Sequence, residues 1–310
     1  MIDLALLRTL TAVREHGSVV AAADVLHCTP SAVSQQLKKL ERQAGTVVVE
    51  RYGRGIMLTE AGHHLAERGA ELLASMEALE ADVAAGHGVV GGRVRMAAFS
   101  TAVRGVVAPL LRRLADDACG IALEVVEEDP PGAVHLVAAG RVDLALVHHW
   151  GDLRPTMPDH LEREVVGLDV ADLLVPADHR LAHCPHVSPD DLRDDVFACA
   201  PVGSVCHQWL TRLFQETGKA PRIAYWAAEF SSHIALVEHG AAVSLIPRLG
   251  RETLPAGVVV LPVEPQVTRT VSVTWRRSMG ASPTVTHLRR LLVHSAPAWG
   301  LLPPSDAGSG

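Results

Sequence analysis

The stretch TPSAVSQQLKKLER, from Thr29 to Arg42, predicts an amphipathic helix with an unusual polar face. Val33, Leu37 and Leu40 recur at helical spacing and form its buried side. The opposite side carries two hydroxyls, an amide and an ammonium, from Ser31, Ser34, Gln35 and Lys38. A helix face that only meets water usually mixes acids and bases. The absence of acids here therefore raises the question of a bound partner.

The residues around this helix predict a helix-turn-helix. Two shorter helical patterns, over 4–16 and 19–26, precede it and are separated by Gly17-Ser18, a helix break followed by an N-cap. The third helix has its own end signals in the sequence, because Thr29 and Pro30 can begin it and Gly45 can end it. In such a motif the second helix enters the DNA major groove with its N-terminus first.

The polar face suits base recognition. Gln35 can bond an adenine through two hydrogen bonds, serines can serve several bases, and Lys38 can reach guanine or phosphate. The next segment, TVVVERYGRGIMLT (46–59), predicts a two-stranded wing whose Arg51 and Arg54 would lie along phosphate or in the minor groove. The alternative is a solvated face on an ordinary three-helix bundle. The predicted DNA-binding residues are Thr29, Pro30, Ser31, Ser34, Gln35, Lys38, Arg51 and Arg54.

A long helical pattern follows the wing, from residue 59 to about 85. Its apolar residues are spaced by 7, 4, 3 and 4 positions, which is a short heptad seam: Leu65, Leu72, Met76, Leu79 and Val83. Such a seam suits a helix pair between two chains. The alternative is that the stripe packs on its own domain, but the Gly-rich segment at 86–92 favours a linker helix that dimerises.

From Arg93 onward, β-type runs alternate with helical runs. This alternation predicts an α/β region with mainly parallel sheets, and two similar blocks suggest two subdomains. The tail at 301–310 is predicted to be disordered.

Composition sets limits on the class of protein. The chain has 310 residues, 48% of them hydrophobic, and a net charge of −7, so a nucleic-acid partner must be met by a local basic patch. The start shows no signal-peptide pattern, no segment is apolar enough to span a membrane, and five scattered cysteines predict reduced thiols. We expect a soluble cytoplasmic protein.

The run GSVVAAADVLHCTPSAVSQQLKKLERQAGTVVVERYGRGIMLTEAG (17–62) resembles the N-terminal signature of LysR-type transcriptional regulators. The segments GRVRMAAFST, LVAAGRVDLALVH, ADHRLAH and ALVEHGAAVSLIPRL then follow in the order of that family. The resemblance covers roughly residues 2–295. One departure is Val48-Val49, where the family usually has Leu-Phe; both pairs are apolar.

The resemblance implies an architecture and a mode of action. It implies a winged helix-turn-helix (1–58), a dimerising linker helix (59–88) and a two-lobed effector domain of periplasmic-binding-protein type (89–300). The lobes would comprise 93–163 with 268–296 (lobe I) and 164–267 (lobe II). Homodimers would pair into homotetramers on promoter DNA, and a small molecule between the lobes would alter recruitment of RNA polymerase by shifting their closure.

In the family that the chain resembles, the ligand cleft lies where strands end and helices begin. The positions of this chain that match are Ser100, Thr101, His148, Gly203 and Ser204, with His149 beside them. Hydroxyls and free N–H groups at helix starts favour an anion, so we expect a carboxylate-bearing effector and no other cofactor. The alternative for the hydroxyl pairs is ordinary helix capping.

Three other functions have weaker support. Cys206 opens a helix, which allows a redox-sensing regulator, but no second cysteine lies in 207–220. The segment HRLAHCPH (179–186) has ligand-like spacing, yet Pro176 and Pro185 predict a loop there. His63, His64 and Glu67 are better interpreted as a solvated face of the long helix, so we expect no metal. The chain contains no catalytic motif, so an enzyme is not expected. A cytoplasmic solute-binding protein would not need a helix-turn-helix.

Overall fold

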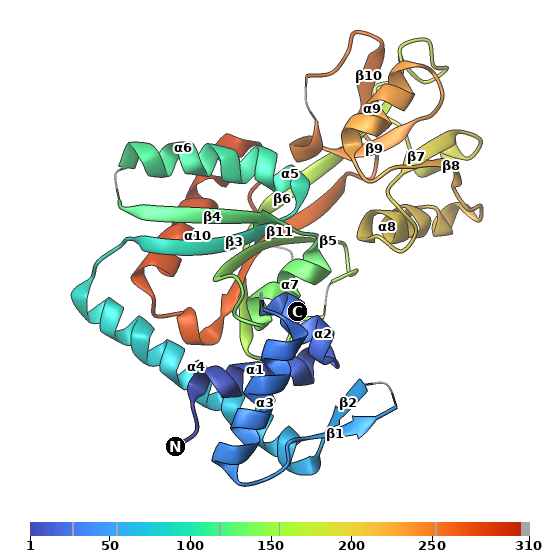
Figure 1. The fold of residues 1–310 in the computed structure, drawn as a ribbon. Coiled ribbons are helices and arrows are strands. Elements are labelled where there is room, and N and C mark those ends of the chain that lie inside the picture. The colour runs from blue at the N-terminus through green and yellow to red at the C-terminus, as the bar shows by residue number, and fades with distance from the viewer. Residues whose placement is uncertain (27, 54, 118, 155, 252, 305–310) are drawn as a thin grey trace. The chain divides into compact units, whose positions relative to one another are not determined.

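The computed structural model describes residues 1–304 except His27, Arg54, Ala118, Pro155 and Glu252 (Figure 1). The chain forms two compact units. One holds Met1–Val89 together with the short segments Ala139–Arg141 and Arg277–Val285, and the other holds the rest.

The N-terminal unit contains three short helices, a wing and a long helix. Its elements in chain order are α1 (Leu4–His16), α2 (Val19–Val25), α3 (Pro30–Ala44), β1 (Val49–Tyr52), β2 (Gly55–Leu58) and α4 (Glu60–His87). The wing strands β1 and β2 pair antiparallel, with Tyr52 opposite Gly55.

The predicted end signals of α3 are confirmed. The Thr29 hydroxyl accepts a hydrogen bond from the N–H of Ala32 at 3.1 Å, and Pro30 occupies the first helical position. Gly45 ends the helix in the left-handed conformation, with a φ of 69° that a residue with a Cβ adopts only at a cost. The start and direction of α3 therefore follow from local sequence.

The core of this unit joins α1, α2 and α3 to the wing and to the first turns of α4. Its fully buried members include Leu10, Val33 and Leu40. The start of α4 approaches the wing so closely that a Cβ added at Gly62 would lie 2.0 Å from the carbonyl oxygen of Val48. Only glycine allows this contact, which holds α4 against the wing.

The second unit is organised by a seven-stranded sheet in the order β10-β6-β11-β5-β3-β4, with β9 also paired to β6. Its strands are β3 (Gly92–Ala98), β4 (Ile121–Glu127), β5 (Leu144–Trp150), β6 (Leu161–Pro176), β9 (Ser244–Pro247), β10 (Val258–Leu261) and β11 (Val267–Arg276). A separate parallel pair is formed by β7 (Val196–Cys199) and β8 (Arg222–Trp226).

Two long strands connect two lobes within this unit (Figure 1). Lobe I holds β3, β4 and β5, lobe II holds β7 to β10, and β6 and β11 run through both. The two-lobed α/β fold predicted from the sequence is confirmed, but the expectation of mainly parallel sheets is wrong. Strand β11 runs antiparallel to β5 and β6, and β6 runs antiparallel to β9 and β10, because the chain crosses between the lobes in both directions.

Helices cover both faces of the lobe I sheet. The segment Ser100–Asp117 is one nearly continuous helical stretch, made of α5 (Ser100–Ala102), a π-helical turn (Val103–Val107) and α6 (Ala108–Asp117). It lies across the sheet from α7 (Pro130–Ala138), as Figure 1 shows. The remaining helices are α8 (Val205–Leu213) and α9 (Phe230–Glu238) in lobe II, and α10 (Pro283–Ser295).

The predicted disorder of the tail is wrong for its first residues. Leu301 is buried, and Leu302 exchanges two backbone hydrogen bonds of 2.8 Å with Leu168 of β6. Gly167 leaves room for this contact, because a Cβ there would lie 2.8 Å from the Cβ of Leu301. Residues 305–310 lie outside the described residues. Across the described parts of the chain, no helix combines the length and the apolar character needed to cross a bilayer.

The contact between Gly62 and Val48 predicts a large difference between two glycine substitutions in one helix. Gly62→Ala should lower the free energy of unfolding by roughly 3 kcal/mol, because its methyl group overlaps the Val48 carbonyl. Gly86→Ala, also in α4 but with nothing within 4 Å of the added Cβ, should raise it by about 0.5–1 kcal/mol through helix propensity. Urea unfolding followed by far-UV circular dichroism at one protein concentration measures both. Equal stabilities for the two variants would contradict the close approach.

Candidate nucleic-acid interface and ligand pocket

The exposed face of α3 keeps its hydrogen-bonding groups available. Ser31, Gln35 and Lys38 are exposed, and among the described residues none has a protein hydrogen-bond or ion-pair partner. Ser34 is also exposed and donates its hydroxyl proton to the Pro30 carbonyl at 2.9 Å, which leaves its oxygen lone pairs open. Thr29 and Pro30 lie at the exposed start of the helix.

The other polar side chains of α3 serve the fold. Gln36 accepts a hydrogen bond from the buried Thr9 hydroxyl at 2.6 Å. Glu41 accepts the backbone N–H groups of Val48 and Val49 at 3.0 and 3.3 Å, which attaches the wing to the helix. The acid and two amides of α3, Glu41, Gln36 and Gln43, thus have partners elsewhere in the unit, whereas Ser31, Gln35 and Lys38 have none among the described residues. This division favours a binding face over a merely solvated one.

A shallow groove extends this face toward the end of α3. It has a volume of about 410 Å³, and its lining residues are Lys38, Glu41, Arg42, Gly45, Thr46 and Val47. Arg42 is exposed one turn after Lys38 and was not among the residues predicted from sequence. The four-residue spacing of two cations on one helix face was the signal that could have found it.

The wing supplies one described arginine. Arg51 lies exposed on β1, opposite Ile56 of β2. The other predicted wing cation, Arg54, lies outside the described residues.

The predicted seam on α4 is exposed along most of its length. The exposed fractions are 48% for Leu72, 37% for Met76, 56% for Leu79 and 56% for Val83. Leu65 instead packs half-buried on the core of the N-terminal unit. The seam therefore begins as part of the fold and continues as an apolar stripe that its own chain leaves uncovered.

In the second unit, a buried ion pair lies where the two lobes meet. Arg269 of β11 is 1% exposed and Asp169 of β6 is 0% exposed, and the two are directly opposite in the strand register. The Arg269 Nε donates to one carboxylate oxygen at 2.9 Å, and its Nη2 lies 2.7 Å from the same oxygen. The other Asp169 oxygen accepts the N–H of Leu249 at 3.1 Å.

This ion pair also engages a predicted ligand residue. The Thr101 hydroxyl accepts a hydrogen bond of 2.6 Å from the Arg269 Nη2 and is buried. Ser100, by contrast, is half-buried at the start of α5. Thr101 is therefore already bound within the protein, and its role is to fix Arg269.

His148 and His149 lie on opposite faces of β5, because side chains alternate along a strand. His148 is buried with its ring 4.6 Å from that of Phe99, edge to face, and its Nδ1 has no described partner. Burial, and secondarily the Arg269 guanidinium, holds the pKa of His148 well below its usual range. Burial lowers the pKa of His149 to about 4, with Arg154 and Arg163 adding to the effect. Both rings are neutral near pH 7.

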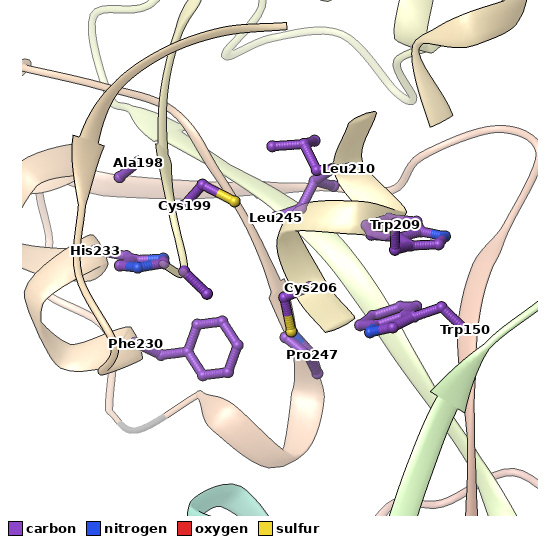
Figure 2. Close-up of a pocket in the computed structure, with 11 residues that line it drawn as sticks. Trp150, Ala198, Cys199, Cys206, Trp209, Leu210, Phe230, His233, Leu245 and Pro247 are labelled. Carbon is purple, nitrogen blue, oxygen red and sulfur yellow. The ribbon is translucent and has the colours of Figure 1, made fainter. Parts of the chain in front are cut away.

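A small pocket lies between β5 of lobe I and the helices of lobe II (Figure 2). Its volume is about 20 Å³, which is room for one water molecule. Trp150 and Trp209 form one side as stacked rings, with centroids 4.2 Å apart and planes 19° from parallel. Phe230 and His233 stand on the other side, and the sulfur atoms of two cysteines lie between them (Figure 2).

The two pocket cysteines do not fit a thiolate switch. Burial raises the pKa of the Cys199 thiol to about 12. It also raises the pKa of Cys206, although the Arg269 guanidinium and a contact with the Trp150 indole partly oppose this. Both groups are therefore neutral thiols near pH 7, and the thiolate is the form that reacts with oxidants. The redox-sensing alternative is not favoured.

Gly203 and Ser204 lie at the start of α8 and outside the lining of this pocket. The Ser204 hydroxyl accepts the N–H of His207 at 3.2 Å, and the Gly203 N–H donates to the ring Nδ1 of His207 at 3.2 Å. The alternative of helix capping thus describes Ser204 well.

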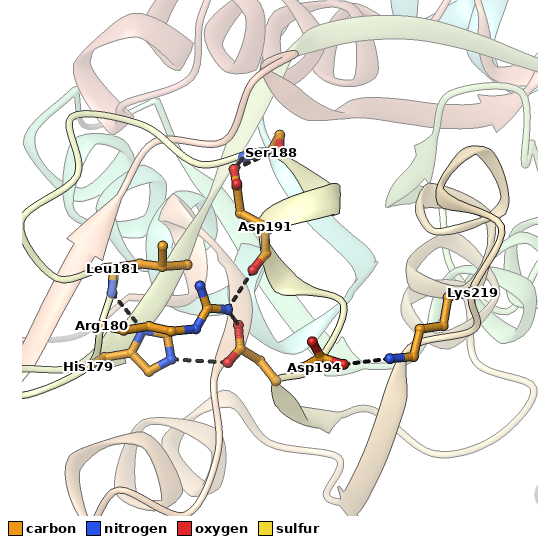
Figure 3. Close-up of polar contacts among 8 residues, drawn as sticks. His179, Arg180, Leu181, Ser188, Asp191, Asp194 and Lys219 are labelled. Atoms are coloured by element: carbon orange, nitrogen blue, oxygen red, sulfur yellow. Dashed lines mark hydrogen bonds and ion pairs between the residues drawn. The ribbon is translucent and has the colours of Figure 1, made fainter.

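The histidine-rich loop after β6 is held by polar contacts with Asp195 (Figure 3). The His179 Nε2 lies 3.2 Å from one carboxylate oxygen, and Arg180 donates to the other at 2.7 Å. The His179 Nδ1 accepts the N–H of Leu181 at 3.3 Å, so both ring nitrogens are occupied. Among the described residues no three His, Cys, Asp or Glu side chains converge as metal ligands.

Comparison with known families covers both units. Residues 87–297 match the LysR substrate binding domain. Residues 4–63 match the bacterial regulatory helix-turn-helix protein of the lysR family.

Individual relatives are distant but span most of the chain. The HTH-type transcriptional regulator TtuA of Agrobacterium vitis is 28% identical over 259 residues, which are 79% of this chain and 83% of that one. A full-length OxyR variant from Pseudomonas aeruginosa has a TM-score of 0.68 at 19% identity, covering 95% of this chain and 94% of that one. Full-length CbnR in complex with its target DNA has a TM-score of 0.54 at 22% identity, covering 95% and 99%. The two structural similarities establish the fold.

The buried ion pair predicts unequal effects for two aspartates of β6. Asp169→Asn should lower the free energy of unfolding by about 3–5 kcal/mol, because it leaves the Arg269 charge buried without a counter-ion. Asp172→Asn should lower the free energy of unfolding clearly less. The side chains of its partners Arg248 and Arg251 are 42% and 19% exposed, so water can solvate their charges. Chemical denaturation of both variants measures the difference. A cost for Asp169→Asn no larger than for Asp172→Asn would contradict the burial of the pair.

The depressed pKa of His149 predicts a loss of stability in acid. Between about pH 6.5 and 4 the unfolded chain takes up a proton at this position that the folded chain does not. The free energy of unfolding should therefore decrease as the pH falls through this range. In His149→Gln that loss should be smaller, which urea unfolding at several pH values would test. An unchanged pH dependence in the variant would show that His149 is not the group responsible.

Proposed function

Because the chain belongs to the LysR family of transcriptional regulators, we propose that it binds promoter DNA through α3 and the wing, under the control of a small molecule in the effector domain. The observation that carries the DNA-binding part is the α3 face. It presents Ser31, Gln35 and Lys38 to solvent without partners among the described residues, while Gln36 and Glu41 are used by the fold.

Each residue has a separate role in this proposal. Gln35 and the serines read base edges in the major groove, where amides and hydroxyls find both donors and acceptors. Lys38, Arg42 and Arg51 neutralise phosphates, which supplies affinity without sequence preference. Full-length CbnR, a protein of the same fold, has been crystallised with its target DNA, which supports DNA binding as the function.

Oligomerisation is part of the same proposal. The exposed stripe Leu72, Met76, Leu79 and Val83 on α4 would pack on the same stripe of a second copy, as a coiled-coil seam does. A dimer would place two α3 helices on two half-sites of a palindrome, and pairs of dimers would make a tetramer. We further propose that the assembly acts in the cytoplasm by altering recruitment of RNA polymerase.

The ligand would act through the lobes. Trp150 belongs to β5 of lobe I and Trp209 to α8 of lobe II, so a molecule that displaces one ring from the other would change the spacing of the lobes. Such a molecule shifts the equilibrium only if it binds one arrangement more tightly than the other. The pocket between the stacked tryptophans and His233 is the place we propose for it.

Two adjacent glutamines provide the sharpest test of the DNA-binding face. Gln35→Ala should weaken specific binding by roughly 1–3 kcal/mol and relax the preference at one or two base pairs. Gln36→Ala, next to it, should lower stability through loss of the Thr9 contact and leave base preference unchanged. A DNase footprint on the DNA upstream of the gene, followed by titration against single-base variants, measures both. Specific binding by Gln35→Ala as tight as by the natural protein would refute this assignment of the face.

The wing should behave differently from the helix. Arg51→Ala should weaken binding to all sequences about equally and reduce the slope of log affinity against log salt by about one unit. Titrations of one specific and one unrelated duplex at several salt concentrations give the slope. A loss confined to the specific duplex would mean that Arg51 reads bases and does not merely neutralise phosphate.

A further inference from the structure

We propose that the pocket between Trp150 and His233 takes a neutral, planar aromatic molecule that carries a hydrogen-bond acceptor. The ring of this molecule would occupy the place of Trp209 against Trp150, and its acceptor would bind the indole N–H of Trp150. The inference rests on the proposed function, because it names the chemical class of the effector.

The walls of the pocket carry no net charge. They consist of aromatic and aliphatic side chains with two thiols and one imidazole. Burial raises the pKa values of Cys199 and Cys206 and lowers that of His233, so all three titratable groups are neutral near pH 7. A site that disfavours charge on its own side chains also disfavours a charged ligand.

The nearest buried cation is already neutralised. The Arg269 guanidinium lies 5.9 Å from the Trp150 ring, but it binds the Asp169 carboxylate and the Thr101 hydroxyl. To pair with Arg269, a carboxylate ligand would have to displace Asp169. This residue is fully buried and also accepts a hydrogen bond from Leu249. A neutral ligand leaves this pair intact.

The shape of the pocket selects a flat ring. Its volume of about 20 Å³ admits one water, so an aromatic molecule enters only where a side chain withdraws. Trp209 is half-buried and stacks on Trp150, which makes it the ring that a planar molecule can replace with the same stacking geometry. Because Trp209 belongs to α8, this exchange would move part of lobe II and couple binding to the lobe arrangement.

The acceptor is favoured by a buried donor that has only a weak partner. Trp150 is 2% exposed, and its indole N–H has no hydrogen-bond partner of normal geometry among the described residues; it faces the thiol of Cys206, a weak acceptor whose pKa this contact lowers. Figure 2 draws the indole nitrogen at the edge of the ring that faces Cys206 and the pocket. A ligand oxygen or nitrogen at this edge would give the buried N–H a stronger acceptor than the thiol.

Three matched probes test the proposal on the full-length protein. Acetophenone is neutral, planar and an acceptor, benzoate is its anionic counterpart, and ethylbenzene lacks the acceptor. The readout is the indole N–H signal in nitrogen-15 NMR spectra, where the chain contributes five tryptophans and the Trp150 signal is identified by its loss in Trp150→Phe. Acetophenone should shift this signal downfield and bind at least about tenfold more tightly than either of the other probes, as one hydrogen bond and an avoided charge burial allow.

The variant gives a second measurement. In Trp150→Phe, which keeps a ring for stacking, acetophenone should bind no more tightly than ethylbenzene. The readout in this variant is the change in the Trp209 indole signal. Benzoate that binds as tightly as acetophenone, or no binding by acetophenone, would overturn the proposal. Protection of promoter DNA in the footprint, measured on the same sample, keeps the regulatory function separate: lost protection counts against that function, whereas retained protection with no acetophenone binding counts only against the ligand class.

Discussion

The arrangement of the second unit depends on a single buried ion pair. Arg269 and Asp169 face each other across β11 and β6, the two strands that pass through both lobes. Two charges in such a site are tolerated because every strong contact is made: the guanidinium has Asp169 and Thr101, and the carboxylate has Leu249. The pair thereby joins the start of α5, the two crossing strands and the short 3₁₀ helix Arg248–Gly250 into one cluster. Removing either charge would leave a buried charge that water cannot reach.

The elements that local chemistry determines could be predicted from the sequence. The capped α3, the wing and the linker helix follow from Thr29, Pro30, Gly45 and the spacing of apolar residues, all of which act within a few positions along the chain. The predictions failed where the role of a residue depends on partners that are distant along the chain. Nothing near Thr101 in sequence reveals that Arg269 will use its hydroxyl, and nothing near Leu301 reveals the β6 edge on which it packs. The sheet was expected to be mainly parallel because alternating β and α runs do not show that a strand passes through both lobes.

On α3, residues of the same type have different roles, because some contact the rest of the unit and others are left exposed. Gln35 and Gln36 are neighbours of the same type, yet one contacts a buried threonine of α1 and the other meets solvent. Lys38 and Lys39 differ in the same way, since Lys39 lies 3.8 Å from Asp3 and Lys38 has no described partner. A wheel diagram separates a buried side from an exposed side, but it does not distinguish an exposed side chain engaged in the fold from one available to a partner. Only the contacts of the folded chain make that distinction.

The close approach of Gly62 to Val48 has a mechanical consequence. The first turn of α4 contacts the backbone that leads into β1, and Glu41 binds the same backbone to α3. The helix α3, the wing and the start of α4 therefore form one rigid body. A rigid body of this kind cannot adapt its DNA-binding face to the operator by local bending. In the proposed dimer, the spacing and angle at which two of these bodies meet DNA would be set by how the two α4 helices cross. Tolerance to operators of different length must come from bending of the DNA or from hinges beyond the end of α4.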